Sequence, residues 1–156
     1  MKGASAGNYA LFAGGRADGF CTTVDAYNAS LTRTTATALS STKKQQRRCN
    51  CREPRNIVGN TASADIYDAS LTKTSAAILS TARTGLAATT VGDYAIFSGG
   101  GVADFCDASL TRSSIGTSMT GYDMGAATIG DYALFAGGHS GEKSDTAYDS
   151  VEVYTA

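Results

Sequence analysis

The chain contains no tryptophan, a single proline and a single histidine among its 156 residues. One proline and many threonines favour strands over disorder. No apolar run approaches the roughly 18 residues that a membrane helix needs, and residues 1–7 lack the apolar core of a signal peptide. We therefore expect a cytoplasmic protein with no membrane partner.

Charge of one sign is also scarce, because the formal net charge is −1. A protein built to bind nucleic acid needs a broad positive surface, so we expect no nucleic-acid partner. The cysteines are Cys21, Cys49, Cys51 and Cys106. A cytosolic setting favours free thiols at these positions over disulfides.

What the chain does have is a nine-residue phrase that occurs three times. The copies at 7–15, 92–100 and 130–138 read Gly-Asn/Asp-Tyr-Ala-Leu/Ile-Phe-Ala/Ser-Gly-Gly. Self-similarity at a period of roughly 20 to 50 residues indicates a repeat architecture. The closing Gly-Gly pair is expected to be structural, since glycine lets a strand end close to a neighbouring sheet.

A second phrase follows each variable stretch. Its copies lie at 24–33, 65–73 and 104–112, and a fourth begins at 151–154. Threonine-rich segments come next, so each period holds four short runs bounded by Gly, Asn, Asp and Ser, which read as strands joined by turns. The sequence therefore predicts an all-β fold.

These features resemble the kelch repeat, whose unit is a four-stranded blade of a β-propeller. The pairs Gly14-Gly15, Gly99-Gly100 and Gly137-Gly138 match its second strand, and Tyr27, Tyr67 and Tyr154 match the tyrosine of its third strand. The resemblance covers nearly the whole chain. The chain departs from the family in two ways. Where the fourth strand of the family carries tryptophan, this chain has Leu31-Thr32-Arg33 and the equivalent segments of the other copies. Its period is about 40 residues, whereas that of the family is about 50.

The resemblance implies a single kelch-like domain over 1–156, with repeat units at about 1–42, 43–82, 83–120 and 121–156. The expected fold is a propeller or partial propeller of about four four-stranded blades, incomplete at both termini. We expect the chain to start at a second strand and to end at a third. An open arc would expose strand edges and apolar faces, which invites self-association.

One segment breaks the pattern. Residues 43–56 hold six of the 13 lysines and arginines and the only proline. A nucleic-acid patch, a metal site at Cys49 and Cys51, and a redox pair are each weak readings, because Cys-x-Cys lacks the usual metal-site spacing. We hypothesise instead that 43–59 is a repeat translated one base out of frame. Pro54 and the charges then replace a buried strand, so the segment is expected to be a surface loop.

No constellation of residues points to catalysis, a metal or a cofactor. The only histidine lies in a glycine-rich loop, and no Gly-x-Ser-x-Gly elbow occurs. We expect a non-enzymatic scaffold that binds a protein or a glycan through the variable loops 16–23, 101–103 and 139–147. The candidate binding positions are Arg16, Asp18, His139, Glu142 and Lys143. The alternatives are a sugar-processing kelch enzyme, and a fragment or decayed copy of a longer repeat protein without independent activity.

The frame hypothesis predicts the nucleotide sequence. Residues 50–57 should correspond to 90–97 of the next repeat. One permitted coding of 49–57 followed by one further base, read from its second base, encodes Ala-Thr-Val-Gly-Asn-His-Ala-Ile-Leu, close to Thr-Thr-Val-Gly-Asp-Tyr-Ala-Ile-Phe at 89–97. Sequencing the gene should show the repeat in the shifted frame, with the frame restored before Asp65. Codons that do not read as the repeat in that frame would end the hypothesis.

Overall fold

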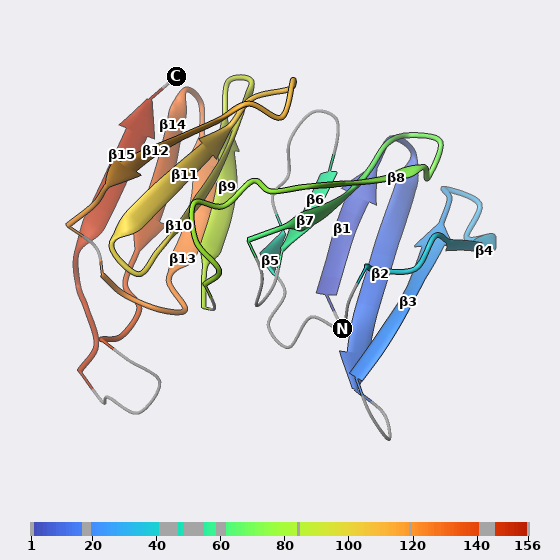
Figure 1. Cartoon of the computed structure of the whole chain (residues 1–156), viewed down its shortest axis with the longest axis horizontal. Coiled ribbons are helices and arrows are strands. Elements are labelled where there is room, and N and C mark those ends of the chain that lie inside the picture. Colours follow the sequence, from blue (N-terminus) through green and yellow to red (C-terminus); the bar gives the residue numbers. More distant parts are fainter. Residues whose placement is uncertain are drawn as a thin grey trace.

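A computed structural model describes residues 2–16, 20–40, 47–48, 55–58, 62–83, 85–118, 120–140 and 146–155 (Figure 1). Over these ranges the secondary structure consists of strands, turns and bends. The prediction of an all-β fold is therefore confirmed. The described part of the chain has no helix that could cross a membrane.

The described strands form four antiparallel sheets, and in each of them neighbouring strands are consecutive in the sequence. Sheet 1 contains β1 (Lys2–Ala6), β2 (Tyr9–Arg16), β3 (Phe20–Tyr27) and β4 (Arg33–Ala36). Sheet 2 contains β5 (Arg47–Arg48), β6 (Arg55–Val58), β7 (Ala64–Tyr67) and β8 (Lys73–Ala76). Sheet 3 contains β9 (Ala87–Val91), β10 (Tyr94–Gly99), β11 (Val102–Cys106) and β12 (Arg112–Gly116). Sheet 4 contains β13 (Gly125–Ile129), β14 (Tyr132–Ala136) and β15 (Val151–Thr155).

The expected start at a second strand is wrong, because sheet 1 has four strands. Its first strand, β1, pairs with β2 from Lys2 opposite Ala13 to Ala6 opposite Tyr9. The small residues of β1 carry little strand propensity, and the two-residue turn at Gly7, whose φ is 50°, holds the strand in place. Sheet 4 has three described strands, as expected for the last repeat.

The assignment of Leu31-Thr32-Arg33 to a fourth strand is also wrong, because β4 begins only at Arg33. Leu31 lies in a turn with a φ of 58°. The side-chain oxygen of Asn28 accepts hydrogen bonds from the amides of Ser30 and Thr32, at 3.0 and 2.9 Å. Equivalent turns begin at Asp68 and Asp107. The recurring Asn/Asp-Ala-Ser-Leu-Thr phrase is therefore a side-chain-capped turn.

The basic segment does not form the continuous surface loop that we expected. Strands β5 and β6 pair with each other, and β6 also pairs with β7. Ladder hydrogen bonds use backbone groups, so charged residues can take part in them, and Pro54 precedes β6 rather than interrupting it. In the backbone register Ile57 is paired with Asp65 as Phe97 is paired with Asp104, which agrees with the expected correspondence of the two repeats. Residues 41–46, 49–54 and 59–61 lie outside the described ranges.

The sheets stack face to face. Successive side chains of a strand point to opposite faces of its sheet, and apolar residues lie on both faces. Three buried clusters hold the stack together. Leu11, Val24, Ala26 and Tyr67 lie between sheets 1 and 2. Ile66, Leu79, Phe97 and Cys106 lie between sheets 2 and 3. Ile96, Ala103, Ala133 and Phe135 lie between sheets 3 and 4.

A polar contact, which we call the serine clasp, joins each sheet to the next. A serine beyond the fourth strand of one sheet donates from its amide and its hydroxyl to a carboxylate on the third strand of the following sheet. The clasps are Ser40 to Asp65, Ser80 to Asp104 and Ser118 to Glu152, with amide distances of 2.9, 3.0 and 3.0 Å. Charge-assisted bonds of this kind compensate for burying a carboxylate.

The clasp at Asp104 also includes a buried cation. The Arg83 guanidinium is paired with the Asp104 carboxylate and donates to the carbonyls of Gly99 and Val102 at 3.0 and 2.9 Å. Burial lowers the pKa of Arg83, and the Asp104 charge acts in the opposite direction. At the Asp65 clasp, burial and then the nearby Asp65 charge raise the pKa of Tyr67, whose hydroxyl donates to the carbonyl of Thr37.

The clasp predicts which aspartates stabilise the fold. Replacing Asp104 by alanine leaves Arg83 buried without its counter-ion and should lower the free energy of unfolding by about 3–5 kcal/mol. Asp25 has the same strand position in sheet 1, but its ion-pair partner there is the exposed Arg33. Asp25→Ala should therefore cost only about 0–1 kcal/mol. Urea unfolding at pH 7 measures both, and equal losses would contradict the role given to the clasp.

Candidate functional site

The candidate site lies where loops from sheets 3 and 4 meet the linkers between sheets. We call this region the loop edge and define it as Gly85, 99–102, 120–124 and 137–140. The amide of Asp123 donates to the Gly85 carbonyl at 2.8 Å, and the amide of Gly100 donates to the Gly121 carbonyl at 3.3 Å. On the other side, Tyr122 and His139 exchange backbone hydrogen bonds of 2.9 and 3.1 Å. The linker 121–123 is thus held from both sides.

Glycine makes this arrangement possible at Gly138. Its φ is 94°, and a Cβ there would lie 2.7 Å from the Tyr122 carbonyl oxygen and 2.7 Å from Met124 Cγ. No larger residue could bring the loop so close to the linker without moving the backbone. In this copy of the Gly-Gly pair the second glycine is therefore structural, as predicted, and it positions the residue that follows it.

That residue is His139, which lies beside two side chains of the linker. Its ring centroid is 6.3 Å from that of Tyr122, and its Nε2 is 3.6 Å from Asp123 Oδ2. The side chains of His139 and Asp123 are 32% and 40% exposed. An imidazole, a carboxylate and a phenol ring thus lie together, partly open to solvent, on a backbone fixed by hydrogen bonds. We call these three residues the His139 group.

The other predicted positions are not brought together with His139. Arg16 ends β2, where its backbone pairs with Phe20, and its side chain is not among those described. Asp18, Glu142 and Lys143 lie outside the described residues. Tyr122 and Asp123 were missed by sequence reasoning, because they belong to a linker rather than to a variable loop. The signal that could have found them is the charged, aromatic pair within the Gly-rich stretch 121–125.

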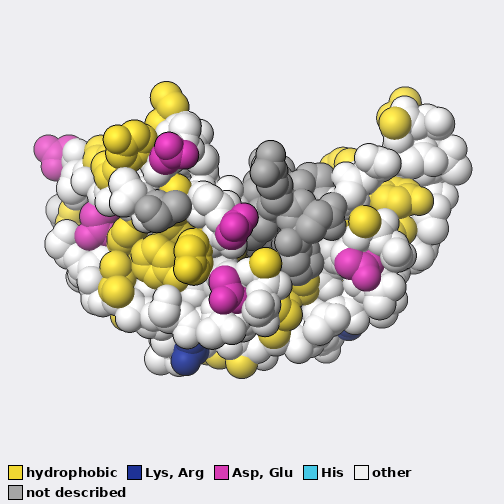
Figure 2. All heavy atoms as spheres, turned by 90° about the horizontal axis from the view of Figure 1, so that it is seen from above, with side chains coloured by type: hydrophobic (Ala, Val, Ile, Leu, Met, Phe, Trp, Pro, Cys, Tyr) yellow, Lys and Arg dark blue, Asp and Glu magenta, His cyan; other side chains and the backbone are white. Residues whose placement is uncertain are grey.

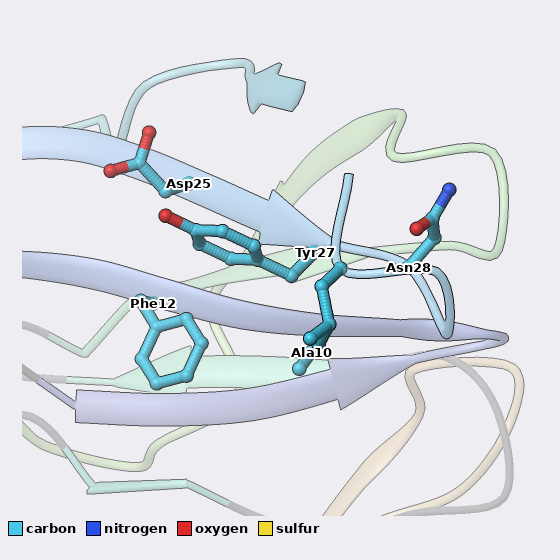
Figure 3. Close-up of a pocket in the computed structure, with 6 residues that line it drawn as sticks. Ala10, Phe12, Asp25, Tyr27 and Asn28 are labelled. Atoms are coloured by element: carbon cyan, nitrogen blue, oxygen red, sulfur yellow. The ribbon is translucent and has the colours of Figure 1, made fainter. Parts of the chain in front are cut away.

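A second feature is an apolar hollow of about 520 Å³ on the outer face of sheet 1 (Figure 3). Its lining residues are Ala10, Phe12, Asp25, Tyr27, Asn28 and Leu31. The rings of Phe12 and Tyr27 meet edge to face with centroids 5.8 Å apart. The Asp25 carboxylate at the margin accepts from Arg33 Nε at 3.0 Å. The hollow is therefore aromatic in its centre and charge-balanced at its margin.

Within the described ranges, no three residues of His, Cys, Asp or Glu are grouped so that they could hold a metal ion. Cys21 and Cys106 do not form disulfides, and Cys49 and Cys51 lie outside those ranges. The His139 group can donate and accept hydrogen bonds beside a ring face, which is chemistry suited to recognition. No protein-family model matches the chain, and a search of the curated proteins found no match.

Proposed function

We propose that the protein is a non-enzymatic repeat scaffold of the kelch-like β-propeller type that binds another protein through its loop edge. The kelch assignment draws support from the repeated phrases, each of which contributes the same strands to an antiparallel sheet. Face-to-face stacking of these sheets is the packing that propeller blades use. On this proposal the four sheets are blades of an arc or an incompletely closed ring.

The observation that carries the binding role is the His139 group. The side chains of His139 and Asp123 are partly exposed, while the backbone of the linker 121–123 is hydrogen-bonded to Gly85, Gly100 and His139, which lie in three separate segments. Rigid backbone with accessible polar and aromatic groups lowers the entropic cost of association. Tyrosine is also enriched at protein interfaces, because it combines apolar area with a hydroxyl.

A glycan is the second candidate ligand, and the Tyr122 ring favours it. A sugar ring presents an apolar face that can pack on an aromatic ring and hydroxyls that can bond to a carboxylate and an imidazole. Tyr122 lies beside Asp123 and His139 in this combination. The two candidates use the same residues, so one set of variants tests both.

The test compares two site variants with a matched surface control. His139→Ala removes the imidazole, and Asp123→Asn removes the charge while keeping a residue that tolerates the φ of 53° at this position. Arg112→Ala on the exposed strand β12 is the control. Proteins captured by the immobilised wild-type chain, or glycans bound on an array, should bind each site variant at least about tenfold more weakly and the control equally well.

Two results would contradict the proposal. Binding that is the same in all four chains would remove the loop edge from the function. Hydrolysis or oxidation of a sugar that depends on His139 would replace the scaffold with the enzyme alternative. Purified wild-type chain and His139→Ala should therefore be screened side by side for turnover of carbohydrate substrates.

A further inference from the structure

Each sheet of the stack has two distinguishable faces. We call the face that points toward the preceding sheet the leading face, and the face that points toward the following sheet the trailing face. In sheet 3, Phe97 and Cys106 on the leading face pack with Ile66 of sheet 2. Ile96 and Ala103 on the trailing face pack with Phe135 of sheet 4. Every internal interface thus joins one trailing face to one leading face.

The leading face of sheet 1 carries equivalent residues, but none of the described strands packs against it. Phe12 pairs with Asp25 across β2 and β3, as Phe97 pairs with Asp104 and Phe135 with Glu152. Phe12 is 41% exposed, whereas Phe97 and Phe135 are fully buried. The hollow seen in Figure 3 is therefore the place that a trailing face occupies at the other interfaces.

The turn that contains Leu31 also indicates that the leading face of sheet 1 lacks a partner sheet. Leu31, Leu71 and Leu110 all adopt a positive φ, which is costly for leucine. Leu71 and Leu110 pack against the apolar clusters that their sheets form with the preceding sheet. Leu31 is 80% exposed and lines the hollow. The turn in sheet 1 therefore has the same leucine, but this leucine packs against no apolar cluster in the described part of the chain.

The trailing face of sheet 4 is the complementary free surface. Ile129, Val151 and Val153 are 69%, 54% and 52% exposed. Their counterparts in sheet 1, by strand pairing, are Ala6, Val24 and Ala26, which are fully buried under sheet 2. The sheets that carry the two free faces lie at opposite ends of the molecule (Figure 1), and hydrophobic side chains are exposed toward both ends (Figure 2).

We propose that two copies of this chain associate head to tail, with the trailing face of sheet 4 in one copy packed on the leading face of sheet 1 in the other. A second copy fits these surfaces because the same chain already joins a trailing face to a leading face at three internal interfaces. The contact would fill the hollow and cover Phe12, Leu31 and Val153. It involves the ends of the stack and does not depend on the function proposed for the loop edge.

The geometry of such a contact is heterologous, because each copy contributes a different surface. A heterologous contact either closes into a ring or continues as an open chain of copies. In both cases each copy uses its leading face of sheet 1 for one neighbour and its trailing face of sheet 4 for the other. Both faces must therefore be intact for the assembly to grow. This requirement gives the proposal a test that a symmetric, same-face dimer would fail.

The experiment uses the full chain and two variants at the most exposed positions. Leu31→Asp places a charge in the leading face and suits the positive φ better than leucine does. Ile129→Lys places a charge in the trailing face. Ile115→Lys is the matched control, since Ile115 is 47% exposed on β12 and belongs to neither free face. Circular dichroism and thermal unfolding establish that each variant folds like the wild type.

Sedimentation velocity over a range of concentrations should show association of the wild type and of Ile115→Lys. Each face variant alone should associate at least tenfold more weakly. A mixture of Leu31→Asp with Ile129→Lys should form a one-to-one pair, because one intact surface of each kind remains. A monomeric wild type, unchanged association of the face variants, or a mixture that does not pair would each overturn the proposal. If the wild type is a monomer in which the Phe12 side chain is shielded from solvent, the two free faces pack on each other within one chain, and the proposal is also overturned.

Discussion

The serine clasp is the contact on which the arrangement of the sheets depends. A carboxylate on a third strand is buried only where the serine of the preceding sheet reaches it with both an amide and a hydroxyl. Because an unpaired buried carboxylate is strongly unfavourable, the clasp fixes how far one sheet can slide over its neighbour. The apolar clusters then fill the remaining space, and they add most of the stabilisation without setting the register.

The loops are consequences of the same repeat. Capped turns beginning at Asn28, Asp68 and Asp107 lead the chain into the fourth strand of each sheet, and those at Asp68 and Asp107 place a leucine against the preceding sheet. At the other end of the strands, Gly138 lets a loop approach the linker closely enough to bond to it. The site at His139 and the free faces at the two ends therefore both follow from the repeat. Each repeat forms a sheet that packs on both faces, and the loops between its strands contact the neighbouring linker.

Much of this fold could be predicted from the sequence where side-chain pattern and backbone conformation agree. The phrase around Tyr94-Ala95-Ile96-Phe97 predicts a strand buried on both faces, and β10 is such a strand. The prediction fails where the backbone acts against the side chain. Lys2–Ala6 looks unlike a strand but pairs with β2, and Leu31 looks like a strand residue but lies in a left-handed turn. The Gly-rich stretch 121–125 marks Tyr122 and Asp123 locally, but their position beside His139 depends on hydrogen bonds between distant segments, which no local pattern encodes.

The central claim is that the clasps hold the sheets together in solution, and amide hydrogen exchange tests it most directly. Ser40, Ser80 and Ser118 lie in irregular segments beyond the ends of strands, where amides ordinarily exchange fast. Their hydrogen bonds to Asp65, Asp104 and Glu152 predict exchange at all three positions as slow as at the paired amides of β10. Exchange at the rate of open loops at these serines would contradict the account.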